Sequence, residues 1–347
     1  MSDKIQHIAV IRLSAMGDVA MTVPVIRALV QQNQHVKVTV VSRPFFQPFF
    51  EGIPNVAFFA VDLNGRHKGT MGLFRLYADI KKLNINAVAD LHNVLRSIVV
   101  RNLFVLSGKK VAHSDKGRTA KKALTSAKNK VFEPVKSMVE RHVETFKTLG
   151  FNIDLIHPVF PEKAQLPEAV FKVSGEKSNT HWIGIAPFAQ YESKVYPLDL
   201  MQEVIVELAK NTSHKIFLFG GGKKETEQLQ ALSANLDNVI VVAGKLKLQQ
   251  DLKLISHLDV MLSMDSGNSH IAAMLGVKVV TLWGATHPYA GFKPFNQPFD
   301  NCLTADREKY PLLPTSVYGN KIVPGYEDAM RTITVATVVA KINSNLA

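Results

Sequence analysis

Short apolar runs alternate with amphipathic stretches along this chain, and the whole alternation occurs twice. Apolar runs that are rich in Val and Ile are typical of parallel strands covered on both faces. The strands expected in the first half are His7–Leu13, Val36–Val41 and Asn86–Leu91. Those expected in the second half are Trp182–Ala186, Lys215–Phe219, Val239–Val242, Asp259–Met264 and Lys278–Trp283.

Between these runs the apolar positions recur at helical spacing. The expected helices run from the turn at Ser14–Asp18 to Leu29, and over Glu140–Leu149, Leu198–Lys210, Glu225–Ala234 and Leu248–Ser256. Alternation of strands and helices predicts the α/β class with doubly wound, Rossmann-like parallel sheets. A polar stretch from Pro161 to Thr180 is the expected linker. We therefore expect two domains, residues 1–165 and 178–329, that face a central ligand cleft.

Composition narrows the choice of partner. A length of 347 residues suits two domains, and the 46% hydrophobic content suffices for two cores. The net charge of +12 indicates an anionic partner, which could be nucleic acid, an acidic membrane surface or a phosphorylated substrate. The single cysteine, Cys302, allows no internal disulfide and favours a reducing compartment. With no leader-like start and no apolar run of membrane-spanning length, we expect a cytoplasmic protein.

The turn after the first expected strand, Leu13–Val19, contains one glycine, Gly17, where a dinucleotide-binding turn carries three. A pyrophosphate held tightly against this turn is therefore not expected. The turn instead places the carboxylate of Asp18 at the start of a helix. Asp18 is either a helix cap or a general base that points into the cleft.

Two turns of the second half could bind a nucleotide. In Gly220–Glu225, three glycines allow close approach of a ligand, and Glu225 could accept hydrogen bonds from a ribose. The alternative is an exposed turn with an acidic residue that favours the helix start. In Met264–Gly276, Ser266 and Gly267 lie where a helix N-terminus would bind a diphosphate. The alternative there is an ordinary strand–helix junction with a structural His270.

Three motifs together resemble the ADP-heptose:lipopolysaccharide heptosyltransferases, glycosyltransferase family 9. Arg12–Val19, with Pro24, resembles the opening motif of that family. Met264–Gly276, continued by Val279–Pro288, resembles its donor motif. Ser193–Pro197 resembles its Lys-x-Trp-Pro segment, with Tyr196 in place of Trp.

This resemblance implies the two-domain GT-B fold, with acceptor binding in the first domain and nucleotide-sugar binding in the second. It also implies that the last helix, about residues 330–347, packs back on the first domain. Asp18 matches the catalytic base of the family, and Lys194 matches the lysine that contacts the donor phosphate and assists catalysis. The expected donor-binding residues are Gly17, Lys194, Glu225, Leu246, Asp265, Ser266, Gly267 and His270.

The chemistry implied is direct displacement at the anomeric carbon of an ADP-sugar, with inversion. Asp18 would take the proton of the acceptor hydroxyl, while Lys194 stabilises the charge of the departing diphosphate. No cofactor is implied, and no group of His, Cys or Asp residues has the spacing of metal ligands.

The expected acceptor is an anionic lipopolysaccharide inner core. Between Lys109 and Lys130 the chain carries eight Lys or Arg residues against one acid, Asp115. The expected acceptor-binding residues are His92, Asn93, Arg96, Lys116 and Arg118. A basic face would also hold the enzyme peripherally on the cytoplasmic side of the inner membrane. The alternative for the basic run is a solvated helix face.

Two other classes fit less well. A Rossmann-type NAD-binding oxidoreductase would need a glycine-rich first turn and an acid after the second strand, which here ends at Ser42-Arg43. A nucleic-acid-binding protein would need aromatic residues among its basic ones, and Lys109–Lys130 contains none. A glycosyltransferase that uses another nucleotide sugar remains the main alternative.

Overall fold

The computed structural model describes residues 6–163, 165–321 and 323–346. The chain divides into two compact units. The first contains the chain up to Lys116 together with Lys136–Val159, and the second contains Gly117–Val135 and the chain from Phe160 onward. Among the described residues, no helix is both long enough and apolar enough to cross a membrane.

The first unit contains a five-stranded sheet with the strand order β3-β2-β1-β4-β5, and every strand pair is parallel. Its strands are β1 (His7–Ile11), β2 (Lys37–Ser42), β3 (Val56–Ala60), β4 (Ala87–Asp90) and β5 (Lys110–His113). At the carboxyl end of central β1, Ile11 lies beside Val41 of β2 and Asp90 of β4. The turns that follow β1 and β4 therefore lie next to each other.

The helices of the first unit have apolar faces that pack on this sheet. They are α1 (Met16–Ala20), α2 (Thr22–Gln32), α3 (Gly69–Lys81), α4 (Leu95–Leu106) and α6 (Met138–Thr148), with the 3₁₀ helix η1 at Pro44–Phe49. Leu76 of α3 and Phe104 of α4 pack with Ile11 in one buried cluster. Ser137 caps α6 and forms a reciprocal capping box with Glu140, which satisfies backbone donors at the helix start.

The second unit contains a six-stranded sheet with the order β11-β10-β9-β6-β7-β8, again with parallel pairing throughout. Its strands are β6 (His181–Ala186), β7 (His214–Leu218), β8 (Val239–Val241), β9 (Val260–Met264), β10 (Lys278–Trp283) and β11 (Cys302–Thr304). Because all strands are parallel, the loops after them lie along one edge of the sheet, where ligands of such folds bind.

The second unit contains seven α-helices within its described residues. They are α5 (Arg118–Leu124), α7 (Glu168–Ser174), α8 (Leu198–Ala209), α9 (Gly222–Leu232), α10 (Leu248–Ser256), α11 (Gly267–Met274) and α12 (Val335–Leu346). Short 3₁₀ helices are η2 (Glu192–Lys194), η3 (Pro288–Ala290), η4 (Phe299–Asn301) and η5 (Ala329–Thr332). Among the described residues, α5 contacts η3 and not the sheet. The segment expected as a linker contains α7, which packs on α10 and buries Val170 completely.

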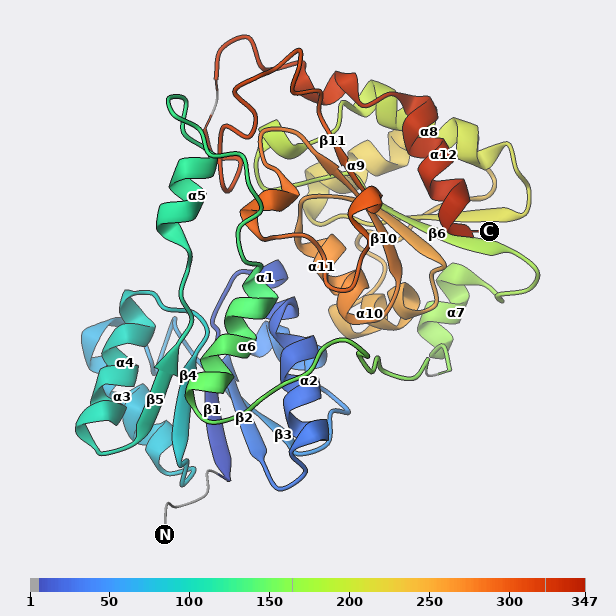
Figure 1. Cartoon of the computed structure of the whole chain (residues 1–347). Coiled ribbons are helices and arrows are strands. Elements are labelled where there is room, and N and C mark those ends of the chain that lie inside the picture. The colour runs from blue at the N-terminus through green and yellow to red at the C-terminus, as the bar shows by residue number, and fades with distance from the viewer. Residues whose placement is uncertain (1–5, 164, 322, 347) are drawn as a thin grey trace. The chain divides into compact units, whose positions relative to one another are not determined.

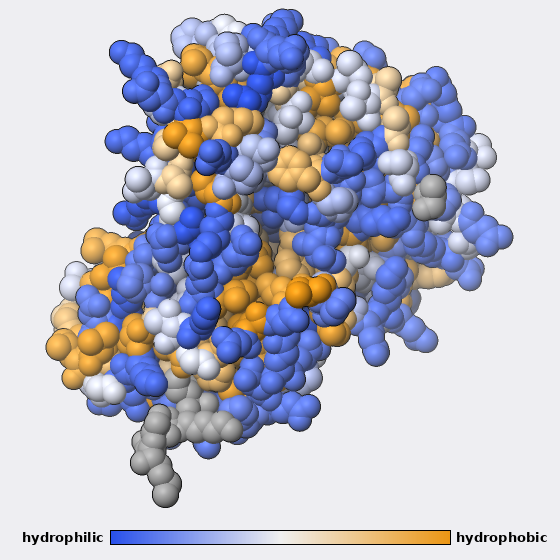
Figure 2. All heavy atoms as spheres, in the orientation of Figure 1, coloured by the Kyte–Doolittle hydropathy of each residue, from blue (hydrophilic) through white to orange (hydrophobic). Residues whose placement is uncertain are grey.

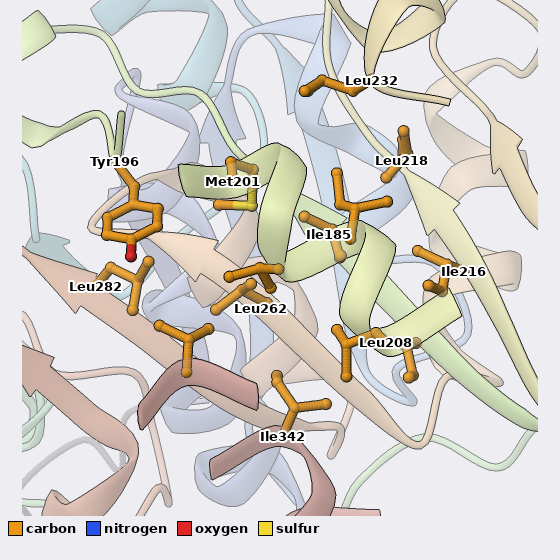
Figure 3. Close-up of a cluster of buried hydrophobic side chains, with 14 of the residues drawn as sticks. Ile185, Tyr196, Met201, Leu208, Ile216, Leu218, Leu232, Leu262, Leu282 and Ile342 are labelled. Atoms are coloured by element: carbon orange, nitrogen blue, oxygen red, sulfur yellow. The ribbon is translucent and has the colours of Figure 1, made fainter. Parts of the chain in front are cut away.

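The core of the second unit lies between β6, β9 and α8 and includes the replaced aromatic residue of the third motif (Figure 3). Tyr196 is fully buried, and its hydroxyl donates a hydrogen bond of 2.6 Å to the Ile333 carbonyl. Burial raises the pKa of Tyr196 to about 12. The Tyr-for-Trp replacement is therefore accommodated in the core by a satisfied hydroxyl.

The C-terminal helix belongs to this same core. In α12, Val338 and Ile342 are fully buried among residues of the second unit, and the helix packs beside α8 (Figure 1). This differs from the packing on the first domain that the family resemblance implied. The apolar face of α12 is covered by α8, β9 and β10, which explains its assignment to the second unit.

The expected α/β class is confirmed, since both sheets are parallel and covered by helices. Three strands were missed: β3, β5 and β11. Each is an edge strand. The sequences of β5 (KVAH) and β11 (CLT) are too short to form an apolar run, whereas β3 (VAFFA) is a continuous apolar run that the prediction overlooked. The domain boundary also differs, because Gly117–Val135 makes its contacts within the second unit.

Candidate functional site

The turn after β1 holds Asp18 in a defined orientation. Ala15 is the N-cap of α1, and Asp18 is the third residue of the helix, where its Oδ2 accepts a hydrogen bond of 3.3 Å from the Ala15 N–H. The same oxygen lies 2.6 Å from Nη2 of Arg12. The Asp18 side chain is still 29% exposed. The Asp18 carboxylate therefore caps a backbone N–H at the start of its own helix and is still accessible to a ligand.

Arg12 connects this turn to the turn after β4. Its side chain is nearly buried, and its Nε donates to the Ser14 carbonyl at 2.8 Å while Nη1 donates to the Leu91 carbonyl at 2.6 Å. Nη2 forms the ion pair with Asp18, so each of the three nitrogens of the planar guanidinium has a partner. The motif residue Arg12, which was not singled out as a site residue, thus sets the orientation of the Asp18 carboxylate.

The turn after β4 is built on a buried carboxylate. Asp90 is fully buried and accepts hydrogen bonds from the backbone N–H groups of His92 and Asn93, at 3.0 and 2.8 Å. Its second oxygen lies 3.0 Å from Nη1 of Arg101 on α4. Asn93, with φ of 48°, donates from its amide to the Ser114 carbonyl and accepts from Arg101. The Asn93 side chain therefore supports the turn itself.

This turn brings His92 to the Asp18 turn. Nε2 of His92 lies 3.5 Å from the Ser14 hydroxyl. Its buried Nδ1 has no hydrogen-bond partner in the part of the chain that the structure describes. Burial, and the positive charges of Arg12 and Lys116, lower the pKa of His92 to about 3. The imidazole is therefore neutral at physiological pH beside the carboxylate of Asp18.

This pKa predicts a specific dependence of stability on pH. The unfolded chain takes up a proton at His92 as the pH falls through about 6.5, whereas the folded chain does so only near 3. The free energy of unfolding should therefore decrease by roughly 1 kcal/mol per pH unit between these values, and not respond to His92 above 6.5. Urea unfolding at pH 7 and pH 5 should show a smaller difference for His92→Gln than for the wild type. Equal differences would contradict the prediction.

The basic residues expected to bind the acceptor are divided between the units. Arg96 is exposed in the first turn of α4, and Lys116 ends the first segment of the first unit. Arg118 begins α5 in the second unit. The structure thus brings Lys116 close enough to His92 for the lysine's charge to lower the pKa of the imidazole. It assigns Arg118 to the other unit.

The rest of the basic segment is partly anchored in the second unit. Lys121 is 4% exposed, and its ammonium lies 4.1 Å from the centre of the Phe292 ring. Lys130 donates to the carbonyls of Leu124 and Pro314, and burial lowers its pKa to about 8. These two cations are structural, so the interpretation of the run as a uniformly solvated face is wrong for them.

In the second unit, Lys194 and Asp265 form the centre of the predicted donor site. Nζ of Lys194 lies 2.9 Å from Oδ2 of Asp265, and both side chains are largely buried. The same oxygen accepts a hydrogen bond of 2.8 Å from the Thr286 hydroxyl. Thr286 lies in the quoted donor motif, but its role was not predicted, because only the fold brings it to Asp265. The pair places a cation at the carboxyl edge of the sheet.

The loop after β9 has the geometry expected for anion binding. Ser266 is the N-cap of α11 with extended backbone, and its hydroxyl contacts Ser263 at 3.1 Å. Gly267 is the first helical residue, so the free N–H groups of the first turn follow directly. His270 is only 6% exposed and lies within the packed face of α11. The structure thus brings Lys194, Asp265 and the start of α11 together.

The remaining donor residues lie on neighbouring loops of the same edge. Oε2 of Glu225 accepts a hydrogen bond of 2.7 Å from the Gly221 N–H, which leaves its other oxygen for a ligand. A Cβ at Gly220 would lie 3.1 Å from that carboxylate, so a larger residue there would require the Glu225 side chain to shift. Leu246 is half-buried in the loop after β8, where Gly244 adopts φ of 77°. Both loops follow strands parallel to β9 and therefore open on the same edge.

Comparison with known proteins identifies the family. Residues 73–319 match the model of "Glycosyltransferase family 9 (heptosyltransferase)". Lipopolysaccharide heptosyltransferase 1 of Campylobacter coli is 27% identical over 81% of this chain and 85% of its own length. A family 9 glycosyl transferase from Veillonella parvula matches with a TM-score of 0.76 at 19% identity, covering 100% of this chain and 98% of that one.

A second solved structure shares this fold. Heptosyltransferase WaaC of E. coli, solved with ADP-2-deoxy-2-fluoro heptose, matches with a TM-score of 0.65 at 19% identity, covering 98% of this chain and 99% of that one. These structural matches show that the two-sheet α/β arrangement is that of the heptosyltransferases. Because the family model spans most of the chain and includes the donor motif, the protein belongs to glycosyltransferase family 9 and is a glycosyltransferase.

Proposed function

We propose that this enzyme transfers heptose from ADP-heptose to an anionic inner-core sugar of lipopolysaccharide, with inversion at the anomeric carbon. The observation that carries the proposal is the Lys194–Asp265 ion pair at the start of α11, on the carboxyl edge of the second sheet. A cation beside free helix N–H groups suits a diphosphate leaving group. The heptose donor is supported by the Campylobacter coli relative and by the sugar nucleotide in the WaaC structure.

Donor binding is assigned to the second unit, with Gly17 as the one donor residue that the first unit contributes. The diphosphate would accept hydrogen bonds from the backbone at Ser266 and Gly267 and lie against Lys194. The free oxygen of Glu225 would accept a ribose hydroxyl, and Leu246 would pack beside the adenine. Asp265, His270 and Gly17 complete the set of donor residues that the family resemblance implies. As the glycosidic bond breaks, negative charge develops on the diphosphate, where the Lys194 ammonium stabilises it.

The base is assigned to Asp18. A sugar hydroxyl is a weak nucleophile until a base takes its proton. In the proposed step the acceptor oxygen bonds to the anomeric carbon, its proton passes to an oxygen of Asp18, and ADP leaves from the opposite face. The salt bridge to Arg12 fixes the carboxylate without enclosing it. Direct displacement of this kind inverts the anomeric centre, and no step requires a metal.

The acceptor is assigned to the basic residues next to the Asp18 turn. Lys116 acts electrostatically on His92, and Arg96 is exposed on α4. Together with His92, on the turn that the Asn93 side chain holds, they would bind phosphate or carboxylate groups of the inner core. Arg118, which lies in the second unit, stays a prediction as an acceptor residue. Such an acceptor is anchored in the membrane, so the enzyme would work in the cytoplasm at the inner face of the inner membrane.

The direct test is a transfer assay. Purified protein is incubated with ADP-heptose and lipopolysaccharide from a strain that lacks heptose, and the product is weighed by mass spectrometry. We expect a mass increase of a single heptose with release of ADP, and no transfer from UDP- or GDP-sugars. Transfer from a UDP- or GDP-sugar would retain the glycosyltransferase but exclude the heptose donor. The proposed function would be contradicted if a correctly folded protein, as judged by cooperative unfolding, transferred sugar from none of the donors.

A further inference from the structure

The outer surface of α3 and α4 exposes large apolar side chains next to one another. On α3, Met71 and Phe74 are 67% and 46% exposed, and both lie on one helix face. On α4, Leu95 and Leu106 are 77% and 83% exposed, and Val105 is 54% exposed. Figure 2 shows hydrophobic side chains at the surface over these two helices. Exposed apolar side chains grouped in this way mark an interaction surface.

The spacing on α4 shows that this exposure forms a stripe. Leu95, Ile98, Asn102, Val105 and Leu106 follow helical spacing along one side of the helix, and all are exposed or half-exposed. Ser97, Val100 and Phe104 form the opposite, buried side. The helix therefore has two apolar sides, although only one of them packs on the sheet.

The two helices are held together from the inside, which keeps their outer faces in a common surface. The rings of Tyr77 on α3 and Phe104 on α4 pack edge to face with centroids 4.7 Å apart. Leu73 and Leu76 of α3 share the buried cluster with Phe104. We call the exposed surface formed by Met71, Phe74, Leu95, Val105 and Leu106 the α3–α4 face.

Basic residues surround the α3–α4 face. Residues 66–82 and 94–110 carry nine Lys or Arg residues and one acid, Asp79. Asp79 is 14% exposed and paired with Arg66, so it contributes little negative charge outward. Exposed cations flank the apolar stripes, namely Lys68, Arg75, Lys81, Lys82, Arg96 and Lys110. Apolar side chains rimmed by Lys and Arg are complementary to a bilayer surface with anionic headgroups.

We propose that the α3–α4 face docks the enzyme on the surface of an anionic lipid bilayer. Met71, Phe74, Leu95, Val105 and Leu106 enter the boundary between headgroups and acyl chains, while the surrounding cations bind lipid phosphates. A second copy of this chain is the other occupant to consider, but the excess of positive charge around the face opposes self-association. The inference rests on the proposed function in one respect: docking would bring the enzyme to an acceptor that is anchored in the membrane.

Flotation with vesicles tests the docking directly. The full chain is mixed with vesicles of phosphatidylcholine alone, or of phosphatidylcholine and phosphatidylglycerol in equal amounts. We expect the wild type to float with the anionic vesicles, and to do so less at high salt because the charges are screened. The double variant Leu95→Glu/Leu106→Glu should bind them at least about tenfold more weakly, because two apolar side chains are replaced by charged ones.

Ile156→Glu is the matched control, since Ile156 is 76% exposed in the same unit but lies outside the α3–α4 face. It should float like the wild type, and all variants should show the thermal unfolding of the wild type. Unchanged flotation of the double variant would overturn the proposal. The proposal would also be overturned if the wild type were a dimer and the double variant a monomer, because a second copy of the chain would then cover the α3–α4 face. The vesicles contain neither donor nor acceptor, so the flotation result does not depend on the outcome of the transfer assay. The transfer assay likewise does not depend on flotation.

Discussion

Asp18→Asn is expected to lower kcat for sugar transfer by about 10²–10⁴-fold, because it removes the proposed base and little else. Asn has the shape of Asp, so one side-chain oxygen can still accept the Ala15 N–H at the start of α1. What is lost is the proton acceptor and the charge that faces Arg12. Release of ADP should be measured at saturating donor and acceptor, and the affinity for ADP should be determined by calorimetry.

A control separates the base from a purely structural carboxylate. Asp62 also accepts backbone N–H groups in a turn of the first unit, from Asn64, Gly65 and Arg66, but it lies outside the predicted site. Asp62→Asn should keep wild-type kcat. ADP affinity should be retained in Asp18→Asn, since every proposed donor residue except Gly17 lies in the second unit. A variant Asp18→Asn that keeps kcat within about twofold would exclude Asp18 as the base.

Lys194→Met is expected to lower kcat/KM by about 10²–10³-fold and to weaken ADP binding. Its ammonium is the charge that the structure places beside the N-terminus of α11. Because that charge interacts more strongly with the diphosphate as the sugar bond breaks, the loss in kcat/KM should exceed the loss in affinity for the uncleaved ADP-sugar. Met retains the apolar stem, so packing around the side chain is largely preserved.

The control for this variant is Lys177→Met. Nζ of Lys177 lies 2.7 Å from Asp259, so it forms a lysine–aspartate pair of similar length within the same unit but away from the predicted site. It should leave both ADP affinity and kcat unchanged. Comparable losses in the two lysine variants would indicate general destabilisation. Full activity of Lys194→Met would show that the phosphate charge is stabilised by other groups.

Much of the fold was predictable because its main features are local. The strands β1, β2, β6, β7 and β9 are buried on both faces, so each is a continuous apolar run that stands out in the sequence. The edge strand β3 (VAFFA) is also a continuous apolar run and was overlooked. The short edge strands β5 and β11 lack such a run. They form because a neighbouring strand supplies hydrogen-bond partners, which no local pattern reveals.

The candidate site was predictable in part for the same reason. Asp18, Ser266 and Gly267 follow strands and begin helices, so sequence order already places them at a ligand-binding edge. Arg12 and Thr286 were not singled out. Their importance depends on contacts with Asp18, Leu91 and Asp265, and two of these three partners are close only in the folded chain.

The sequence by itself determined the α/β class, the two parallel sheets and the family, since periodicity and contiguous motifs are properties of neighbouring residues. Only the tertiary structure decided where the basic segment belongs. Its Lys121 packs on Phe292, and just beyond the segment the centre of the Phe132 ring lies 3.3 Å from Cζ of the Arg307 guanidinium; both partners are more than a hundred residues away in the chain. Charge alone could not assign these residues, because a cation attracts an anionic acceptor and an aromatic ring alike, and the fold determines which of them it meets.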